Sequence, residues 1–87
     1  MTVQVEFFGI PRQRAGVATA LVNARRLGEI LCELSSVYPK LAETCVDGRQ
    51  LRPGFVANLN GERFVTDPDT SLDPGDCLLI LTADAGG

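Results

Sequence analysis

The sequence predicts an α+β fold, in which a mixed sheet of about four to five strands carries one main helix on one face. Three observations predict it: alternating apolar and polar residues near the N-terminus, an apolar stripe at helical spacing in the middle, and a wholly apolar run near the C-terminus. A length of 87 residues suits one small core. We expect residues 1–81 to form a single domain and residues 82–87 to form a flexible tail that ends in Gly-Gly.

The first predicted strand has one buried face. Apolar residues alternate with polar ones at Val3, Val5 and Phe7, which is the period-two pattern of a half-buried strand. Phe8 then falls on the opposite, outer face, because successive side chains of a strand point to opposite sides.

A loop and a second strand follow. Residues 9–16 begin and end with glycine and contain Pro11, a pattern that predicts a loop. Residues 17–24 include several β-branched side chains, which favour an extended conformation. We therefore expect a second strand there, paired with the first.

The main helix is predicted from its spacing. Apolar residues recur every three to four positions and form one stripe that should face the core: Leu27, Ile30, Leu31, Leu34, Val37 and Tyr38. Pro39 ends the helix, since the residue before a proline avoids helical geometry. Cys32 lies off the stripe and is expected at its margin or on the exposed face.

The signals weaken between residues 40 and 54, where we expect an irregular crossing with turns near Gly48 and Gly54. Residues 55–59 then predict a third strand. The next two residues, Asn60-Gly61, are a strong hairpin signal, because both central residues of a type I′ turn need positive φ. Residues 62–65 return as a short fourth strand.

The last strand is expected at residues 77–81, the most apolar run of the chain, after a turn at residues 73–76. Such a strand suits the centre of the sheet, and a central last strand beside the first is the β-grasp (ubiquitin-like) arrangement. Alternation directs Leu78 and Ile80 toward the helix. The other side chains of this strand point outward: Cys77, Leu79 and Leu81.

This outward face is a candidate docking surface. One helix cannot cover both faces of a sheet, so Leu79 and Leu81 would be exposed together with Phe8 from the neighbouring strand. Exposed apolar clusters in soluble proteins usually mark interaction sites. Alternatively, a second copy of the chain or residues 40–54 cover the cluster. The candidate rim residues are polar: Arg63 and Asp76.

Composition excludes several classes of function. The chain has 8 basic and 11 acidic residues, and a net charge of −3 argues against nucleic acid or an anionic membrane as a partner. It has no histidine and three cysteines without a Cys-x-x-Cys spacing, so we expect no disulfide and no metal site. Neither a signal peptide nor an apolar run of about 20 residues is found, which indicates a cytoplasmic protein.

The C-terminus itself is the candidate reactive site. Gly86 gives the terminal carboxylate of Gly87 a neighbour without a side chain and with a freely rotating backbone. Six extended residues reach about 20 Å. The carboxylate can therefore enter a narrow channel in another protein that a Cβ atom would block.

Together these features resemble the ubiquitin-like sulfur carriers, which include the small subunit of molybdopterin synthase and the sulfur carrier of the thiamine pathway. The resemblance rests on the order of the predicted elements and on short motifs: Phe7-Phe8, Asn60-Gly61-Glu62, Gly75-Asp76 and the terminal Gly86-Gly87. One position differs, because Thr82-Ala83 stands where molybdopterin synthase small subunits commonly have two prolines.

The resemblance implies a chemistry for the tail. An ATP-dependent activating enzyme would adenylate the Gly87 carboxylate, and sulfur would then replace AMP to give a thiocarboxylate. Gly86 would meet a steric requirement of the active-site channel, and the preceding residues would contact its walls: Ala83, Asp84 and Ala85. The chain itself would bind no cofactor.

The same resemblance implies partners. These are the activating enzyme, a sulfur donor protein, and a sulfur-accepting enzyme or large synthase subunit. The chain would be a carrier, or a small non-catalytic subunit of a sulfurtransferase complex such as molybdopterin synthase.

Two other functions compete with the carrier. A ubiquitin-like modifier would use the same adenylation and then form an isopeptide bond from Gly87 to a target lysine. A β-grasp binding module would use the fold without any chemistry at the tail. A β-grasp ferredoxin is excluded, because its cluster needs four cysteines and the chain has three.

Overall fold

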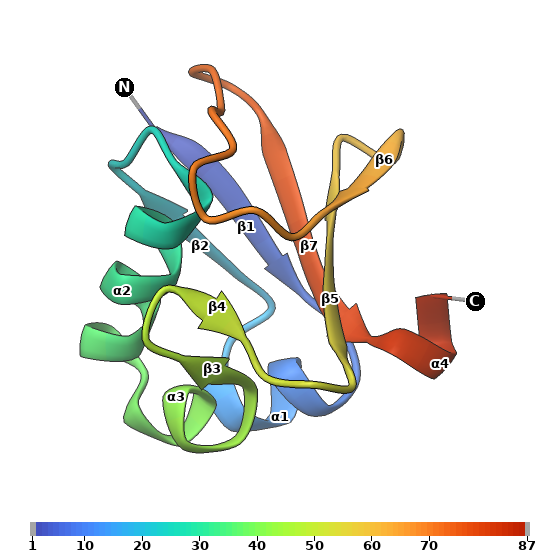
Figure 1. Cartoon of the computed structure of the whole chain (residues 1–87). Coiled ribbons are helices and arrows are strands. Elements are labelled where there is room, and N and C mark those ends of the chain that lie inside the picture. Colours follow the sequence, from blue (N-terminus) through green and yellow to red (C-terminus); the bar gives the residue numbers. More distant parts are fainter. Residues whose placement is uncertain (1, 87) are drawn as a thin grey trace.

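The structure is a computed structural model that describes residues 2–86. Its centre is a five-stranded mixed sheet in the order β2-β1-β7-β5-β6. The strands are β1 (Val3–Phe7), β2 (Thr19–Val22), β5 (Phe55–Leu59), β6 (Arg63–Val65) and β7 (Cys77–Thr82). β7 runs parallel to β1, and the other pairs are antiparallel. The predicted β-grasp sheet, with the last strand central and beside the first, is confirmed (Figure 1).

The main helix, α2 (Leu27–Val37), packs on one face of the sheet as predicted (Figure 1). Val37 departs from the prediction, because its side chain is 61% exposed. The helix ends at this residue, and the ring of Tyr38 turns to the core instead, edge-on to Phe7 at a centroid distance of 6.0 Å. The rest of the stripe is buried: Leu27, Ile30, Leu31 and Leu34.

The predicted loop at residues 9–16 is wrong, because a short helix, α1 (Ile10–Ala15), occupies it. Pro11 lies in its first turn, where the missing N–H costs nothing, and its side chain is buried. The glycines that suggested a loop flank the helix instead, and Gly16 ends it in the left-handed conformation with φ 78°.

The irregular crossing predicted for residues 40–54 is also wrong. Pro39 begins a second short helix, α3 (Pro39–Cys45), whose residues Leu41 and Cys45 are buried one turn apart. A small hairpin follows, made of β3 (Val46–Asp47) and β4 (Gln50–Leu51). Its turn contains Gly48 at φ 63°, which confirms the predicted turn there.

The hairpin between β5 and β6 confirms the turn prediction. Asn60 and Gly61 both have positive φ, 57° and 71°, and the Glu62 amide donates to the Leu59 carbonyl at 3.0 Å. The Asn60 side chain also accepts from the Cys77 amide at 2.8 Å and donates to Asp76 at 3.0 Å. These bonds tie the hairpin to the start of the central strand.

Asp76 is the hub of this network. Hydrogen bonds from the Asn60 side chain and from the Asp73 amide favour its charged form, and they hold the pKa of the Asp76 carboxyl below its usual value. Two of the motifs that suggested a family, Asn60-Gly61-Glu62 and Gly75-Asp76, therefore position the last strand rather than supply reactive groups.

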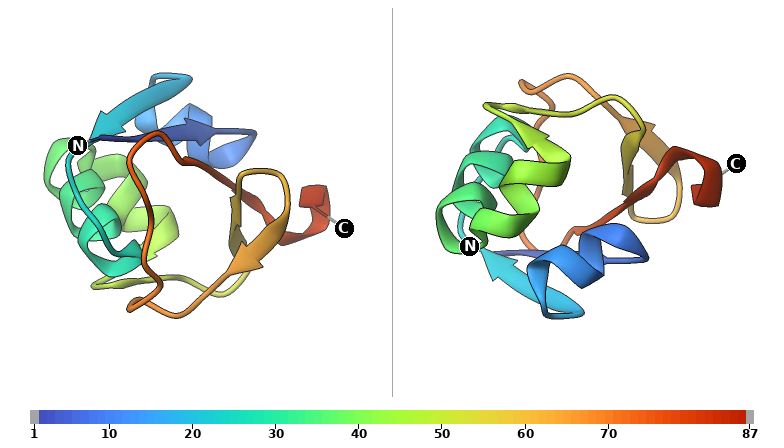
Figure 2. Two further views of the ribbon diagram at one scale, coloured as in Figure 1. Left: turned by 90° about the horizontal axis from the view of Figure 1, so that it is seen from above. Right: turned by 90° about the horizontal axis from the view of Figure 1, so that it is seen from below.

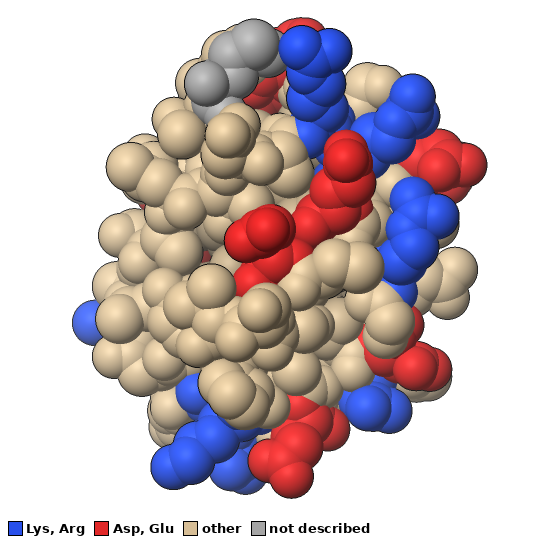
Figure 3. Space-filling model, turned by 90° about the vertical axis from the view of Figure 1, so that its left-hand side faces the viewer, with Lys and Arg blue, Asp and Glu red and all other residues tan. Residues whose placement is uncertain are grey.

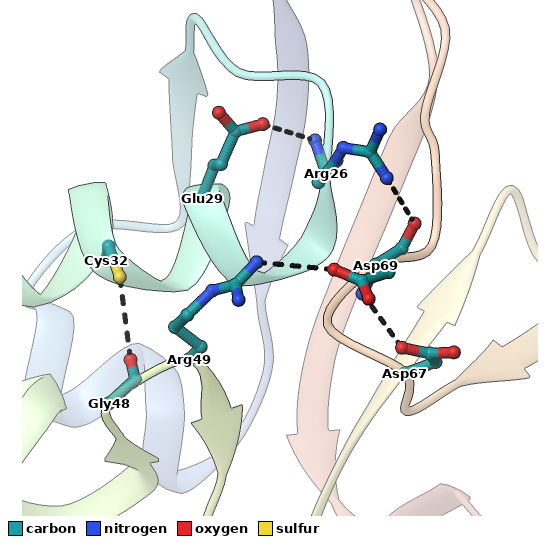
Figure 4. A network of polar contacts seen from close by, with 7 residues as sticks. All are labelled: Arg26, Glu29, Cys32, Gly48, Arg49, Asp67 and Asp69. Carbon is teal, nitrogen blue, oxygen red and sulfur yellow. Dashed lines mark hydrogen bonds and ion pairs between the residues drawn. The ribbon is translucent and has the colours of Figure 1, made fainter.

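The N-terminus of α2 is capped by the loop that precedes β7. The amides of Leu27 and Gly28 donate to the carbonyls of Thr70 and Pro68 at 3.0 and 2.9 Å. The Glu29 side chain accepts from the Arg26 amide at 3.1 Å. Figure 4 shows the surrounding contacts, in which the backbone carbonyl and the carboxylate of Asp69 accept from Arg26 and Arg49.

The helices lie at different sides of the sheet, and α1 contacts α3 and β7. Figure 2 shows α2 and α3 on one side of the sheet and the last short helix, α4 (Ala83–Gly86), beyond β5 and β7 on the other side. None of the helices that the structure describes is both long enough and apolar enough to cross a membrane.

Candidate functional site

The outer face of the sheet, away from α2, carries the predicted apolar surface. Alternation along β7 is as predicted, with Leu78 and Ile80 both 0% exposed in the core. The outward residues of the neighbouring strands form a row with Leu81. Leu81 pairs with Val56 on one side, and Phe8 follows Phe7, which pairs with Ile80, on the other.

A second row of outward-facing residues lies two residues before Leu81 along β7. Asn58 of β5 pairs with Leu79 of β7 and with Phe64 of β6. Phe64 is 52% exposed and Phe8 is 56% exposed. We call these five apolar residues the outer-face patch: Phe8, Val56, Phe64, Leu79 and Leu81.

Two details of the predicted surface are corrected. Leu81 points outward but is only 7% exposed. The helix α4, which was not foreseen, contacts both β7 and β5 and lies on their outer side, so it covers the end of the strand (Figure 2). Arg63 pairs with the inward-facing Leu59, so it lies on the opposite side of β6 from the patch.

Phe64 takes the place predicted for a polar rim residue. Its neighbour Val65 is buried, and alternation therefore turns Phe64 outward. The sequence alone could have predicted this outward orientation of Phe64, because Val65 is the apolar residue that ends the predicted strand. The alternative that residues 40–54 cover the patch is wrong, since α3, β3 and β4 contact one another or the helices α1 and α2.

The patch surrounds a buried side-chain oxygen, that of Asn58, for which the described residues provide no hydrogen-bond donor. Within the described residues, the side-chain oxygen of Asn58 is buried and accepts no hydrogen bond. A buried acceptor left unpaired costs about 1–3 kcal/mol. The cross-strand neighbours of Asn58 in the patch, Leu79 and Phe64, are both apolar, so the centre of the patch holds an acceptor that the fold does not use.

The tail begins directly beside the patch. β7 extends through Thr82, and the Ala83 amide donates to the Gly54 carbonyl at 2.8 Å, which anchors the chain at the edge of the patch. The backbone then forms the single turn of α4 rather than an extended tether. Ala83 and Asp84 are exposed. Gly87, the predicted reactive residue, lies outside the described residues, and the predicted roles of the tail stay predictions.

The three cysteines are free thiols, as predicted. Cys45 is buried, and burial raises the pKa of its thiol. Burial, followed by the nearby Glu6 carboxylate, raises the pKa of the half-buried Cys77. Both therefore stay protonated at neutral pH and are poor nucleophiles. Among residues 2–86 no group of three or more His, Cys, Asp or Glu side chains is placed to hold a metal ion.

The chain is similar to known proteins over its whole length. The model of the ThiS family matches residues 5–87. The crystal structure of SAMP1 from Haloferax volcanii shares 22% identity and a TM-score of 0.80, with 100% of both chains covered. No curated protein sequence matches the chain.

Two further solved structures show the same fold. A putative molybdopterin converting factor subunit 1 from Pyrococcus furiosus shares 24% identity and a TM-score of 0.77, over 94% of this chain and 97% of the other. A chain of the BexX/CysO complex from Amycolatopsis orientalis shares 24% identity and a TM-score of 0.78, over 98% of this chain and 99% of the other.

Proposed function

Because the chain belongs to the ThiS family, we propose that it is a sulfur carrier whose Gly87 carboxylate is activated and converted to a thiocarboxylate. One observation carries this proposal: the family match extends to residue 87, so the terminal Gly86-Gly87 falls within the family's own region. The proposed place of action is the cytoplasm, where ATP is available to the activating enzyme.

The chemistry explains the need for activation. A free terminal carboxyl group has a pKa of about 3.5, so at neutral pH it is an anion and a poor electrophile. Attack of this carboxylate on the α-phosphate of ATP releases pyrophosphate and forms an acyl adenylate. A hydrosulfide equivalent from a sulfur donor protein then displaces AMP and leaves the thiocarboxylate. The carrier contributes position rather than a catalytic side chain, and it holds no cofactor of its own.

The outer-face patch is the proposed docking surface for the activating enzyme. It lies on β5, β6 and β7 and just beyond the end of β1, and Leu81 of the patch is followed directly by Thr82 and the tail. A partner bound to the patch would therefore hold its active site within reach of Gly87. A similar chain was solved in the BexX/CysO complex, which supports binding of a protein partner by this fold.

A biosynthetic enzyme is the proposed acceptor of the sulfur, such as the large subunit of a molybdopterin synthase. The likeness to a putative molybdopterin converting factor subunit 1 supports this choice. The second candidate is conjugation of Gly87 to lysines of other proteins, because the chain also shares its fold with the small archaeal modifier protein SAMP1. Both functions begin with the same adenylate.

Mass spectrometry of the intact protein, purified from its own host, tests the proposed function. A thiocarboxylate replaces one oxygen by sulfur and adds about 16 Da to the mass, with the change confined to the C-terminal peptide. Incubation with iodoacetamide would add one cap to the terminal sulfur beyond those on the three free cysteines, which distinguishes it from an oxidised side chain. Isopeptide-linked adducts alone would favour the modifier. A terminus that is unmodified in all of the protein purified from its host would contradict both the carrier and the modifier function.

We expect Phe8→Glu and Leu79→Glu to weaken binding to the activating enzyme by about 1–3 kcal/mol each, in the range of interface hot spots. Both substitutions place a charge on the outer-face patch, where a partner would have to desolvate it. Titration of each folded variant by calorimetry is the measurement. Val37→Glu is the matched control, because Val37 is 61% exposed but lies on α2. Affinity unchanged in both patch variants would place the docking surface elsewhere.

A further inference from the structure

A second surface lies at the β2 edge of the sheet. Within residues 2–86, β2 pairs with β1 alone, so its other side is open. The Phe7 amide donates to the Ala18 carbonyl at 2.9 Å, and this bond fixes which residues of β2 face β1. Bonded pairs alternate in an antiparallel ladder, so the N–H and C=O groups of Thr19 and Leu21 point away from β1 to the open edge.

This edge lacks the usual protection. Natural proteins blunt exposed edges with charged residues, proline or a bulge, because a bare edge recruits other strands. Residues 17–23 contain no charged residue and no proline. Leu21 is 72% exposed and Val17 is 39% exposed. The opposite edge, β6, has only three residues and carries Arg63.

A groove runs beside the open edge, between β2 and α2. It has a volume of about 290 Å³, and both apolar and polar groups line it: Ala20, Leu21, Val22, Asn23, Glu33, Leu34, Val37 and Tyr38. Ala20 and Val22 pair with the inward residues Val5 and Val3, so they face the helix side. An added strand would therefore point alternate side chains into this groove.

The charge of the groove indicates which kind of partner can bind there. Glu33 is the single charged residue in the lining, it is exposed, and α2 carries two acidic and no basic residues. Figure 3 shows this side of the molecule with a broad uncharged surface, a few acidic side chains near its middle and basic side chains along its upper, right and lower edges. A second copy of the chain, paired through β2 about a two-fold axis, would bring two acidic helices together at a net charge of −3 each.

We propose that the β2 edge and its groove bind an extended segment of a partner protein. The segment adds as a strand beside β2, takes the free backbone groups of Thr19 and Leu21, and places alternate aliphatic side chains in the groove. A lysine or arginine of the segment pairs with Glu33. The groove lies on the helix side of the sheet, opposite the outer-face patch, and β1 separates the β2 edge from β7, so this partner and an activating enzyme can bind together.

A peptide titration of the full chain tests the proposal. The probe is a capped peptide in which valine alternates with threonine and lysines flank both ends, and the readout is the set of backbone amide shifts. We expect concentration-dependent shifts at residues 19–23 and at Glu33 and Val37. The amides of Thr19 and Leu21 should exchange more slowly with solvent when the peptide is bound, since they gain strand hydrogen bonds.

Two variants separate the backbone and charge contributions. Leu21→Pro removes an outward N–H that makes no bond to β1, so we expect at least about tenfold weaker binding with the fold kept. Glu33→Lys changes an exposed helix residue and should reverse the preference, so that a glutamate-flanked peptide binds better than the lysine-flanked one. Phe8→Glu is the control and should bind the peptide as the unmodified chain does.

Three results would overturn the proposal. The first is an absence of shifts at residues 19–23 at saturating peptide, and the second is a set of shifts confined to the outer-face patch. The third is a homodimer in sedimentation experiments that Leu21→Pro dissociates, which would show that a second copy covers the edge. None of these results bears on the thiocarboxylate, so the two proposals fail independently.

Discussion

Replacing Ile80 by alanine is expected to lower the free energy of unfolding by about 2–5 kcal/mol. Ile80 is 0% exposed and lies in the central strand between Phe7 and Ala57. Its neighbours are held by strand hydrogen bonds on both sides, so they cannot collapse into the space that the lost methyl and methylene groups leave. A small domain is stable by only about 5–15 kcal/mol, so this loss is a large fraction of the total.

Urea unfolding followed by circular dichroism measures this effect. Leu21→Ala is the matched control, because Leu21 is also an aliphatic strand residue but is 72% exposed. We expect the control to lose less than about 1 kcal/mol. If the two variants unfolded at the same urea concentration, Ile80 would not face the helix and the register of the central strand would be wrong.

The orientation of Ile80 was predictable because burial leaves a periodic trace in the sequence. A strand with one buried face alternates, and a helix with one buried face repeats every three to four residues. These two patterns located β1, β7 and α2, and the positive φ that Asn60 and Gly61 tolerate located the β5–β6 hairpin. The sheet order then followed from placing the most apolar strand at the centre.

The short helices α1 and α3 were not predictable from their prolines, because the effect of proline depends on its position in a helix. In the interior of a helix it breaks the hydrogen bonds, but in the first turn it costs nothing and favours the helical φ. Pro39 ends α2, as predicted, but it also begins α3. Pro11 favours a loop in the sequence but lies in the first turn of α1. Each helix has at most seven residues, too few for its own apolar period to be clear.

The outer-face patch was predicted only in part, because its limits depend on tertiary contacts. Phe8 and Leu79 follow from alternation within one strand. The low exposure of Leu81 depends on contacts from outside its own strand, and both α4 and α1 contact β7. Arg63, in contrast, was predictable from alternation, because the buried Val65 turns Phe64 outward and Arg63 inward.

Replacing Gly86 by valine is expected to reduce formation of the C-terminal adenylate by at least about 100-fold. In the proposed mechanism the channel of the activating enzyme is wide enough only for a backbone without side chains. Valine would add a branched side chain with a restricted χ1, which could not fit into the channel. Deletion of Gly87 should have the same effect, because it withdraws the carboxylate by one residue, about 3.5 Å. Neither change touches the core, so both variants should keep the unfolding midpoint of the unmodified chain.

Exchange of labelled pyrophosphate into ATP, with the activating enzyme in excess, measures adenylate formation directly. A series of Gly86→Ala and Gly86→Val should show a graded loss if channel width is the cause, since alanine adds one methyl group and valine adds three carbons. Val37→Ala, on the far side of the fold from the tail, is the control and should react normally. Normal exchange by the folded Gly86→Val protein would remove the steric argument. Normal exchange after deletion of Gly87 would show that activation does not require the full length of the tail.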